Sequence, residues 1–477
     1  MTDQLTPPKA GHSLLVLLTI ASATLMIVLD ASIINIALPR AQSDLALSDV
    51  ARPWIITAYA LSFGGLLLLG GRIADTFGHR RMFLLGLAGF ALASAFGGFA
   101  SSGTALILAR ALQGMFGAVL APAALALLTT TFTAPEERAR AFAVYGAVQG
   151  LGGAVGLLLG GALTEFLGWR WCFFINLPIA LAVGLAALKS IPPGSARKPG
   201  NLDLIGAVLS VTGLTTLVYG LTVAGEGNTA GTHRALPLVA ILAGVGVLAL
   251  FALHQRAARH PLLPLSIPME RSRGAAFLSL LLIGAGMFGM LMFLAYYLQV
   301  VLGFSPLQTG LAFLPFSGGI ILGSSLASHL MPRLGDGRTM WIGLLGASIG
   351  MVWLTPVGIG PGFAQQVLPA LCVMSLGLGV YFVPASSSAL KGVPEAQSGV
   401  ASALVNVTQQ VGGAIGPALL NTIFLFATQA DPENRLQVPD GYRAAFVAAA
   451  VLFVLALIIA LLLPRSARTA SAGSKAR

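Results

Sequence analysis

The chain has 477 residues, of which 56% are hydrophobic and only 9% are charged, and its formal net charge is +11. Soluble domains carry about 25% charged residues, so this composition excludes a soluble globular protein and predicts a polytopic membrane protein in contact with the lipid bilayer. The basic residues are spread over many short segments without a basic stripe, which argues against a nucleic-acid partner.

Fourteen apolar segments are long enough to cross a bilayer as helices. They lie near 14–38, 52–72, 82–101, 104–131, 139–165, 171–190, 204–223, 236–254, 274–300, 307–330, 340–357, 363–390, 398–427 and 443–463. We therefore expect an all-α fold of two six-helix bundles with two extra central helices. The expected divisions are a first bundle (1–190), a linker with the extra helices (191–273), a second bundle (274–465) and a cytoplasmic tail (466–477).

Lysines and arginines are distributed unequally between the two sides of this layout. The segments that share a side with the termini hold 20 of them, the opposite segments hold 6, and Arg110 alone lies inside a predicted span. Cytoplasmic loops of membrane proteins are enriched in Lys and Arg. The pattern predicts a multi-pass protein of the cell membrane, inner or plasma, with both termini in the cytoplasm.

Asp30 is the one acidic residue deep inside a predicted span. A carboxylate at that depth costs about 3 kcal/mol on insertion scales, and such groups usually have a function. We expect Asp30 to take up and release a proton, and a cationic substrate would compete for the same carboxylate. The alternative is a packing role, with Asp30 bonded to a neighbouring Ser or Asn such as Ser32 or Asn35.

Arg110 is the second charged residue expected at membrane depth, about seven residues into the fourth segment. Asp30 and Arg110 both fall in the outer half of the membrane, so they could meet across the bundle and control proton release. The alternative is an arginine that reaches to the outer headgroups. Gln113 lies on the same helical face as Arg110, where it could bond the arginine or line a cavity.

Three further groups of residues have candidate roles. A charged loop after the second segment is predicted to act as a conformational latch, unless its arginines only set the topology. Glycines of the fifth segment allow close helix approach, as a hinge or as static packing. Polar residues within spans are predicted to line a substrate cavity, unless they only bond neighbouring helices. The latch comprises Gly71, Asp75, Gly78, Arg80 and Arg81; the glycines are Gly152, Gly156, Gly160 and Gly161; the cavity residues are Asn35, Gln113, Asn406 and Gln409.

Several motifs occur in a fixed order along the chain. They are Leu29–Pro39 (LDASIINIALP), Gly71–Arg81 (GRIADTFGHRR), Arg110–Gly114 (RALQG), Gly152–Gly161 (GGAVGLLLGG) and Trp169–Pro178 (WRWCFFINLP). Together they resemble the fourteen-helix drug:proton antiporter branch of the major facilitator superfamily. The chain departs from that pattern at Thr76 and His79, where basic residues are expected, and at Leu157, where a proline is expected.

This resemblance implies proton-coupled export of amphipathic, cationic drugs or antibiotics by alternating access. Asp30 would be the proton carrier, the proton gradient would be the energy source with no cofactor or metal, and the chain would work as a monomer. The alternative is an exporter dedicated to one endogenous metabolite. An intramembrane enzyme is a weaker alternative, because the sequence has no H-E-x-x-H and Asp30 has no second acidic residue at membrane depth. No G-x-x-x-x-G-K-[ST] is present to support ATP-driven transport.

Overall fold

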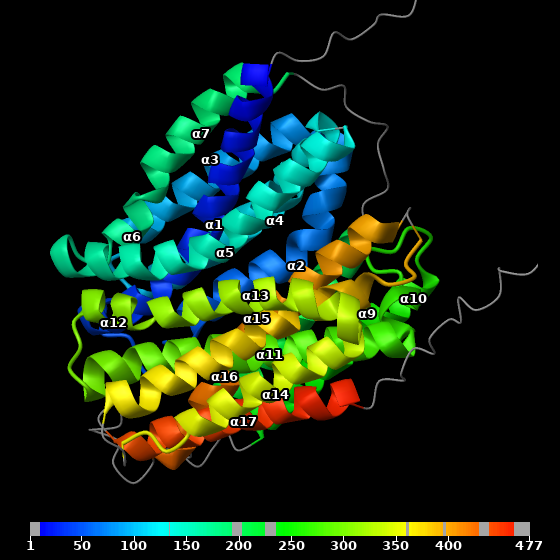
Figure 1. Cartoon of the computed structure of the whole chain (residues 1–477). Helices are drawn as coiled ribbons and strands as arrows, with labels where there is room; N and C mark the ends of the chain where they lie inside the picture. The colour runs from blue at the N-terminus through cyan, green and yellow to red at the C-terminus, as the bar shows by residue number, and fades with distance from the viewer. Residues whose placement is uncertain are drawn as a thin grey trace, which may run out of the picture.

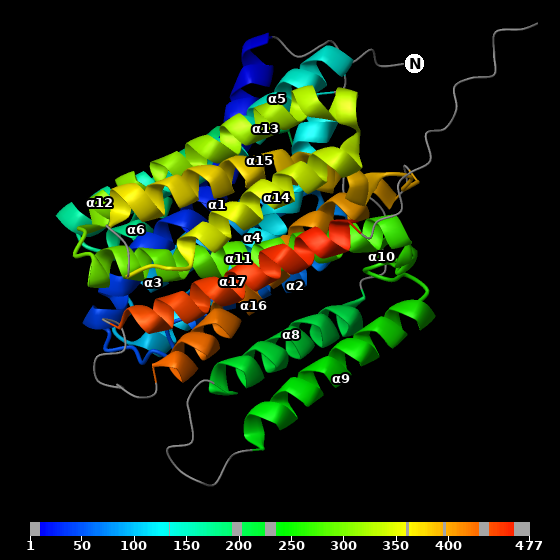
Figure 2. The ribbon, with the colours of Figure 1, turned by 60° about the horizontal axis from the view of Figure 1, so that its bottom comes forward.

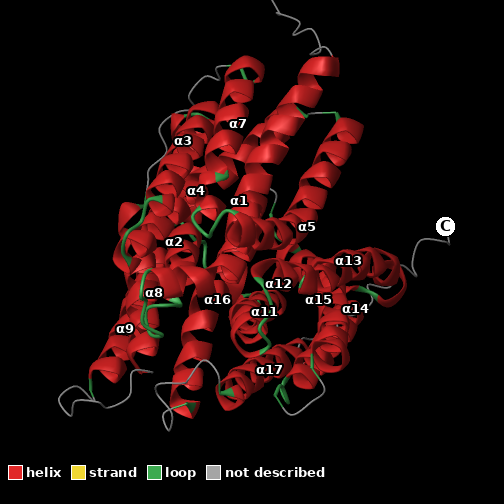
Figure 3. Cartoon of the chain, turned by 90° about the vertical axis from the view of Figure 1, so that its left-hand side faces the viewer, coloured by secondary structure: helices red, strands yellow, loops and turns green. Residues whose placement is uncertain are grey.

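The computed structural model describes residues 10–132, 134–192, 203–224, 235–358, 362–394, 397–428 and 438–461. Within these ranges every regular element is a helix (Figure 3). The predicted tail at 466–477 and most of the linker at 191–201 lie outside the described residues.

Thirteen helical segments of the described chain are long and apolar enough to cross a membrane. The fourteenth predicted segment, at 340–357, corresponds to helix α14 (Asp336–Leu354), which packs along its neighbours α15 and α17. Its first turn carries Asp336 and Arg338, and these charges lower its mean hydropathy. The predicted all-α membrane architecture is confirmed.

The first half of the chain forms one bundle (Figure 1). Helix α4 packs against α2 and α3, and α1 packs against α5 and α7. Gly78 has a φ of +94° between α2 and α3, a conformation that favours glycine, and it turns the chain sharply there. The helices are α1 (Ala10–Asp44), α2 (Trp54–Phe77), α3 (His79–Gly98), α4 (Gly103–Thr131), α5 (Pro135–Phe166), α6 (Trp171–Phe174) and α7 (Asn176–Ser190).

The second half forms another bundle, in which α11 packs against α16 and α17, and α15 packs against α13 and α14. Two short π-helices continue α11 and precede α15. Its remaining elements are α10 (Ser266–Met269), α11 (Arg271–Tyr296), η1 (Tyr297–Val301), α12 (Pro306–Ala312), α13 (Leu314–Leu334), η2 (Phe363–Val367), α15 (Leu368–Leu390), α16 (Ser398–Ala427) and α17 (Pro439–Leu461).

The extra helices α8 (Leu204–Ala224) and α9 (Leu236–Ala257) pack on each other at the side of the two bundles (Figure 2). Only α8 of the pair makes extensive contacts with the bundles, through α2 and α16. The start of α8 is joined to the last turn of α9 by Asp203, which accepts hydrogen bonds from Gly206, His254 and Gln255. Burial alone would raise the pKa of Asp203, but these hydrogen bonds outweigh it and lower the pKa.

The two bundles meet along two seams. At the first, α2 packs along α16, and Thr57 donates a hydrogen bond to the carbonyl of Ala414 at 3.1 Å. At the second, α5 packs against α12 and α13. These seams hold the bundles around a central space, which contains the candidate site.

Candidate functional site

Asp30 turns its carboxylate into the first bundle, and only 1% of the residue is exposed. Arg110 of α4 donates from Nη1 to Asp30 Oδ2 at 2.6 Å. Gln113 of α4 and Asn176 of α7 each donate an amide N–H to Asp30 Oδ1 at 2.8 Å. The ionised carboxylate is therefore satisfied by three donors, one of them a guanidinium.

Arg110 is equally buried, at 1% exposure, and it makes further contacts inside the bundle. Its Nε donates to the carbonyl of Ile55 at 3.1 Å, and its Nη1 also donates to Gln113 Oε1 at 2.9 Å. Its guanidinium carbon lies 4.3 Å from the ring centre of Tyr59. Arg110 does not reach to headgroups, and the expected meeting of Asp30 with Arg110 across the bundle is what the structure shows.

Ser32 and Asn35, the examples given for a packing role of Asp30, do not bond its carboxylate, whereas Asn176 does. Ser32 donates to the carbonyl of Val28, and Asn35 donates to the carbonyls of Ala31 and Ser32 within the same helix. Local bonding of this kind is open to short polar side chains in a helix.

Sequence reasoning missed three members of this cluster, namely Asn176, Ser94 and Tyr59. Ser94 of α3 accepts bonds from the Gln113 and Asn176 amides at 2.8 and 3.2 Å, and both Ser94 and Asn176 are 0% exposed. Asn176 is a polar residue of the Trp169–Pro178 motif. Its place in that motif is the feature of the sequence that could have indicated a role in the cluster. Ser94 and Tyr59 had no comparable signal, because both residue types are ordinary in helix interiors.

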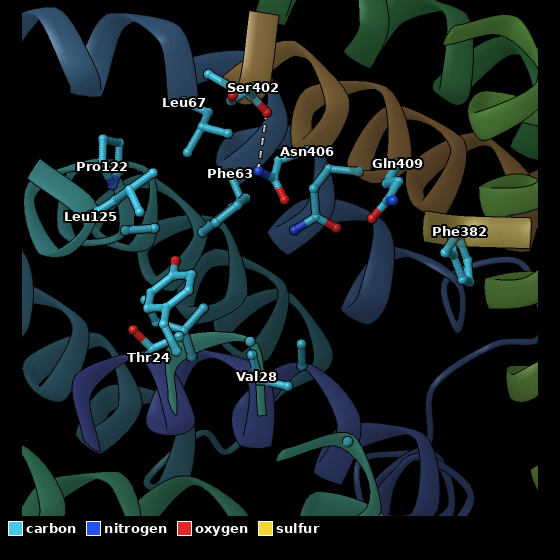
Figure 4. Close-up of a pocket in the computed structure, with 18 of the residues that line it drawn as sticks. Thr24, Val28, Phe63, Leu67, Pro122, Leu125, Phe382, Ser402, Asn406 and Gln409 are labelled. Atoms are coloured by element: carbon cyan, nitrogen blue, oxygen red, sulfur yellow. Dashed lines mark hydrogen bonds between the residues drawn. The ribbon is translucent and has the colours of Figure 1, made fainter. Parts of the chain in front are cut away.

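A cavity of about 990 Å³ lies between the two bundles. Asn35, Asn406 and Gln409 line it as expected, and Asn406 donates to the carbonyl of Ser402 at its wall (Figure 4). Gln113 was expected there too, but it is 0% exposed and belongs to the Asp30 cluster. Its amide is drawn away from the cavity by the carboxylate and by Ser94.

Asp30 itself is absent from the described cavity lining. The lining residues of α1 are Thr24, Ile27, Val28, Ala31, Ser32 and Asn35, which share one helical face, and Asp30 points from another. Tyr59 lines the cavity and contacts Arg110, so it stands between the cavity and the buried pair. The expected competition of a proton and a cationic substrate for direct contact with one carboxylate does not fit this geometry.

We call the end of the molecule at which the cavity reaches Gly71, Arg72 and Asp75 the open end. Asp75 lies 3.0 Å from His79 Nε2, and Arg80 donates to the carbonyl of Leu188 at the end of α7, also at 3.0 Å. The predicted latch residues thus engage different partners in this conformation. Arg80 bonds a neighbouring helix end, and Arg81 is exposed.

The opposite end, which we call the closed end, is where the bundles meet. Arg52, in the connection between α1 and α2, is 0% exposed and donates from Nη2 to Asn421 of α16. Its guanidinium carbon lies 4.6 Å from the ring centre of Tyr296 and 5.3 Å from those of Phe293 and Phe424. A cation of the first bundle is therefore held in an aromatic cage of the second.

A second set of contacts seals the closed end where α5 meets α12. Ser305 Oγ and the Leu307 backbone N–H donate to Glu165 at 2.6 and 2.8 Å. A Cβ atom on Gly161 would lie 2.6 Å from the carbonyl oxygen of Pro306, and one on Gly310 would lie 2.6 Å from that of Leu157. The predicted glycine ladder is thus divided: Gly161 faces the second bundle, whereas Gly152, Gly156 and Gly160 pack against α1.

Gly161→Ala is expected to weaken this seal by about 1–3 kcal/mol, because a methyl group cannot fit against the Pro306 carbonyl without backbone movement. The measurements are the thermal unfolding midpoint in detergent and the rate of transport in vesicles, both of which should fall. Gly246→Ala on α9 is the control, since it makes the same change in a helix outside the described cavity lining, where a Cβ atom meets nothing within 4 Å. Equal behaviour of the two variants would contradict the role assigned to Gly161.

Two helical bundles around a cavity that is open at one end and sealed at the other define a membrane transport protein. The model of the Major Facilitator Superfamily matches residues 20–417, and the chain belongs to this family. Its members are transporters, and the curated relatives include exporters and resistance proteins for antibiotics and other drugs.

Two relatives and one solved structure illustrate the similarity. Puromycin resistance protein pur8 of Streptomyces alboniger is 49% identical over 423 residues, which cover 87% of this chain and 82% of that protein. Cephamycin export protein CmcT of Amycolatopsis lactamdurans is 36% identical, over 98% of this chain and 95% of that protein. A bacterial homologue of the human lysosomal transporter Spinster, in an inward-facing and unoccupied conformation, has a TM-score of 0.68 at 17% identity, over 95% of this chain and 97% of that one. This last likeness concerns the fold.

Proposed function

We propose that the chain is a proton-coupled exporter of amphipathic small molecules that works by alternating access. The observation that carries the proposal is the buried Asp30–Arg110 pair, which lies one side chain away from a cavity between the bundles. Intramembrane ion pairs of this kind mark proton relays in transporters. Names of relatives that include resistance to puromycin and export of cephamycin support the direction of transport.

Proton binding to Asp30 would force the cluster to rearrange. The ionised carboxylate accepts three bonds, whereas a protonated one has an O–H that needs an acceptor. Asn176 Oδ1 is buried without a hydrogen-bond partner among the described residues, so rotation of that amide would supply the acceptor. Arg110 would lose its anionic partner at the same time, and an unpaired buried charge is costly.

This rearrangement has a direct route to the seam between the bundles. Arg110 bonds Ile55 and contacts Tyr59, both on α2, and α2 packs along α16 of the second bundle. A shift of Arg110 would therefore act on the helix that joins the two bundles. In this mechanism the proton gradient supplies the energy without a cofactor, and one chain is sufficient.

The excess of basic residues on the side of the termini supports a cytoplasmic open end in the cell membrane. Under this orientation the structure corresponds to a state that receives substrate from the cytoplasm. The expectation of a cationic substrate rested on the family resemblance and on competition with the proton for Asp30, and the buried position of that carboxylate gives the second of these grounds little support.

A second candidate is an exporter dedicated to one endogenous metabolite, such as a self-made antibiotic. It is favoured by relatives named for single compounds, including the cephamycin export protein and a probable actinorhodin transporter of Streptomyces coelicolor.

The test is transport of a compound panel by the purified chain in proteoliposomes under an imposed proton gradient. We expect several amphipathic compounds to move against their own gradients, and movement should stop when a protonophore removes the proton gradient. Movement of one metabolite alone would favour the dedicated exporter. Transport that persists at the same rate without a proton gradient would overturn proton coupling.

A further inference from the structure

The described lining of the cavity is uncharged except at its mouth. The only charged residues in its described lining are Arg72 and Asp75, both near the end of α2 at the open end. Deeper in the cavity the polar groups are neutral amides and hydroxyls. These include Asn35, Asn406, Gln409, Gln410, Ser32 and Ser317.

The other acidic residues that the structure describes offer no counter-charge at that depth. Of the acidic residues within the described ranges, Asp30 is the one that lies in the interior of a helix, away from its first and last turns. Asp30 already accepts three hydrogen bonds, points away from the cavity and is screened from it by Tyr59. At the mouth, Asp75 pairs with His79, and Arg72 adds an opposing positive charge.

Aromatic rings are the other groups that can attract a cation, so their arrangement matters. Among the described residues, four arginines lie over aromatic rings, namely Arg52, Arg110, Arg138 and Arg170. The one of these rings that also lines the cavity is Tyr59, and it is already in contact with Arg110. Besides Tyr59, the aromatic residues of the described lining are Phe63, Tyr145, Phe288, Phe316 and Phe382. Of these, Phe63 and Phe382 come from different bundles and lie well apart in Figure 4. They form separate parts of the wall and supply apolar surface there.

We infer that the cavity binds its substrates in an uncharged form. It fits compounds with an aromatic, apolar body and carbonyl, amide or hydroxyl groups that bond the cavity amides, and it discriminates against fixed organic cations. Burying a cation without a counter-charge is costly, whereas neutral polar groups can be satisfied by Asn and Gln side chains. The inference rests on the proposed function only in taking this cavity as the substrate site.

The experiment compares two compounds of similar size and aromatic content in equilibrium binding to the full chain in detergent. Triphenylphosphine oxide is neutral and carries one strong hydrogen-bond acceptor, and tetraphenylphosphonium is a permanent cation. We expect the oxide to bind at least tenfold more tightly. Gln409→Glu and Asn406→Asp should each tighten binding of the cation at least tenfold at pH 8, because each adds a carboxylate at the cavity wall.

Gln308→Glu is the matched control. It adds the same charge at the start of α12, outside the described cavity lining, and a glutamate preserves the capping box with Ser305. Its affinities should match those of the wild type. Equal or tighter wild-type binding of the cation, no binding of either compound, or no gain of cation binding in both cavity variants would each overturn the inference. The measurement needs no proton gradient, so a failure of proton coupling alone would leave the selectivity intact.

Discussion

Asp30→Asn is expected to abolish proton-driven transport while leaving the chain folded. An asparagine is nearly the same size as an aspartate and can still accept the bond from Arg110, but it cannot take up or release a proton. Its N–H₂ group would face the donors of Gln113 and Asn176, and the unpartnered Asn176 Oδ1 could accept from it after rotation of that amide. The variant should therefore resemble a cluster fixed in one protonation state.

The measurement is uptake of a transported compound by proteoliposomes, with and without an imposed pH gradient. The difference between the uptake rates with and without the pH gradient should fall in Asp30→Asn to the value for vesicles without protein. The affinity for triphenylphosphine oxide should stay within threefold of the wild-type value. Asp44→Asn is the control, because it makes the same change in the same helix at an exposed pair with Arg170. Wild-type proton-driven rates in Asp30→Asn would contradict the mechanism.

The membrane architecture and the approach of Arg110 to Asp30 could both be predicted from the sequence, because unpaired polar and charged groups have a high free energy inside a lipid bilayer. Apolar segments of span length have few alternatives to a helix in a membrane, and a lone carboxylate at membrane depth needs a partner. Arg110 was the one basic residue inside a predicted span. Its level in the outer half of the membrane and the family motif that contains it favoured an approach to Asp30 over a reach to the headgroups.

Side-chain direction was harder to predict than position along the chain. Gln113 and Asn35 are both polar residues in spans, yet Gln113 bonds Asp30 and Asn35 lines the cavity. Which face of a helix meets the cavity depends on how the two bundles are placed, and no local pattern in the sequence encodes that. Ser94 was missed for the same reason, since its role arises from contacts with α4 and α7.

The surroundings of Arg52 were even harder to predict from the sequence. Arg52 stands at the start of the second predicted span, near 52–72, and was counted only as one of the basic residues on the side opposite the termini. In the structure it is 0% exposed, because three aromatic rings and Asn421 of the other bundle surround it. The residues that make the cage lie more than 240 positions later in the chain, at 293, 296, 421 and 424.

Arg52→Ala is expected to shift the chain toward states in which the closed end is open. The contact between a desolvated guanidinium and one aromatic ring is worth about 0.5–2 kcal/mol, and its bond to an amide adds about 1.5 kcal/mol. Loss of the side chain should therefore weaken the seal by about 3 kcal/mol, or about a hundredfold in the equilibrium between states. The cage is organised for this cation, since Gln42 joins Tyr296 at 2.6 Å to Asp49 at 2.8 Å.

The measurement is labelling of Leu291→Cys, a cavity position on α11, by a membrane-impermeant maleimide added at the closed end. The exposed Cys372 is first replaced by serine, and the buried Cys172 is kept. Labelling should rise at least tenfold in Arg52→Ala and by less in Arg52→Lys, which retains the charge but loses the planar guanidinium. Arg170→Ala is the control, because Arg170 pairs with Asp44 within the first bundle and should leave labelling unchanged. Unchanged labelling in Arg52→Ala, with the protein still folded, would mean that the α5–α12 contacts alone hold the closed end.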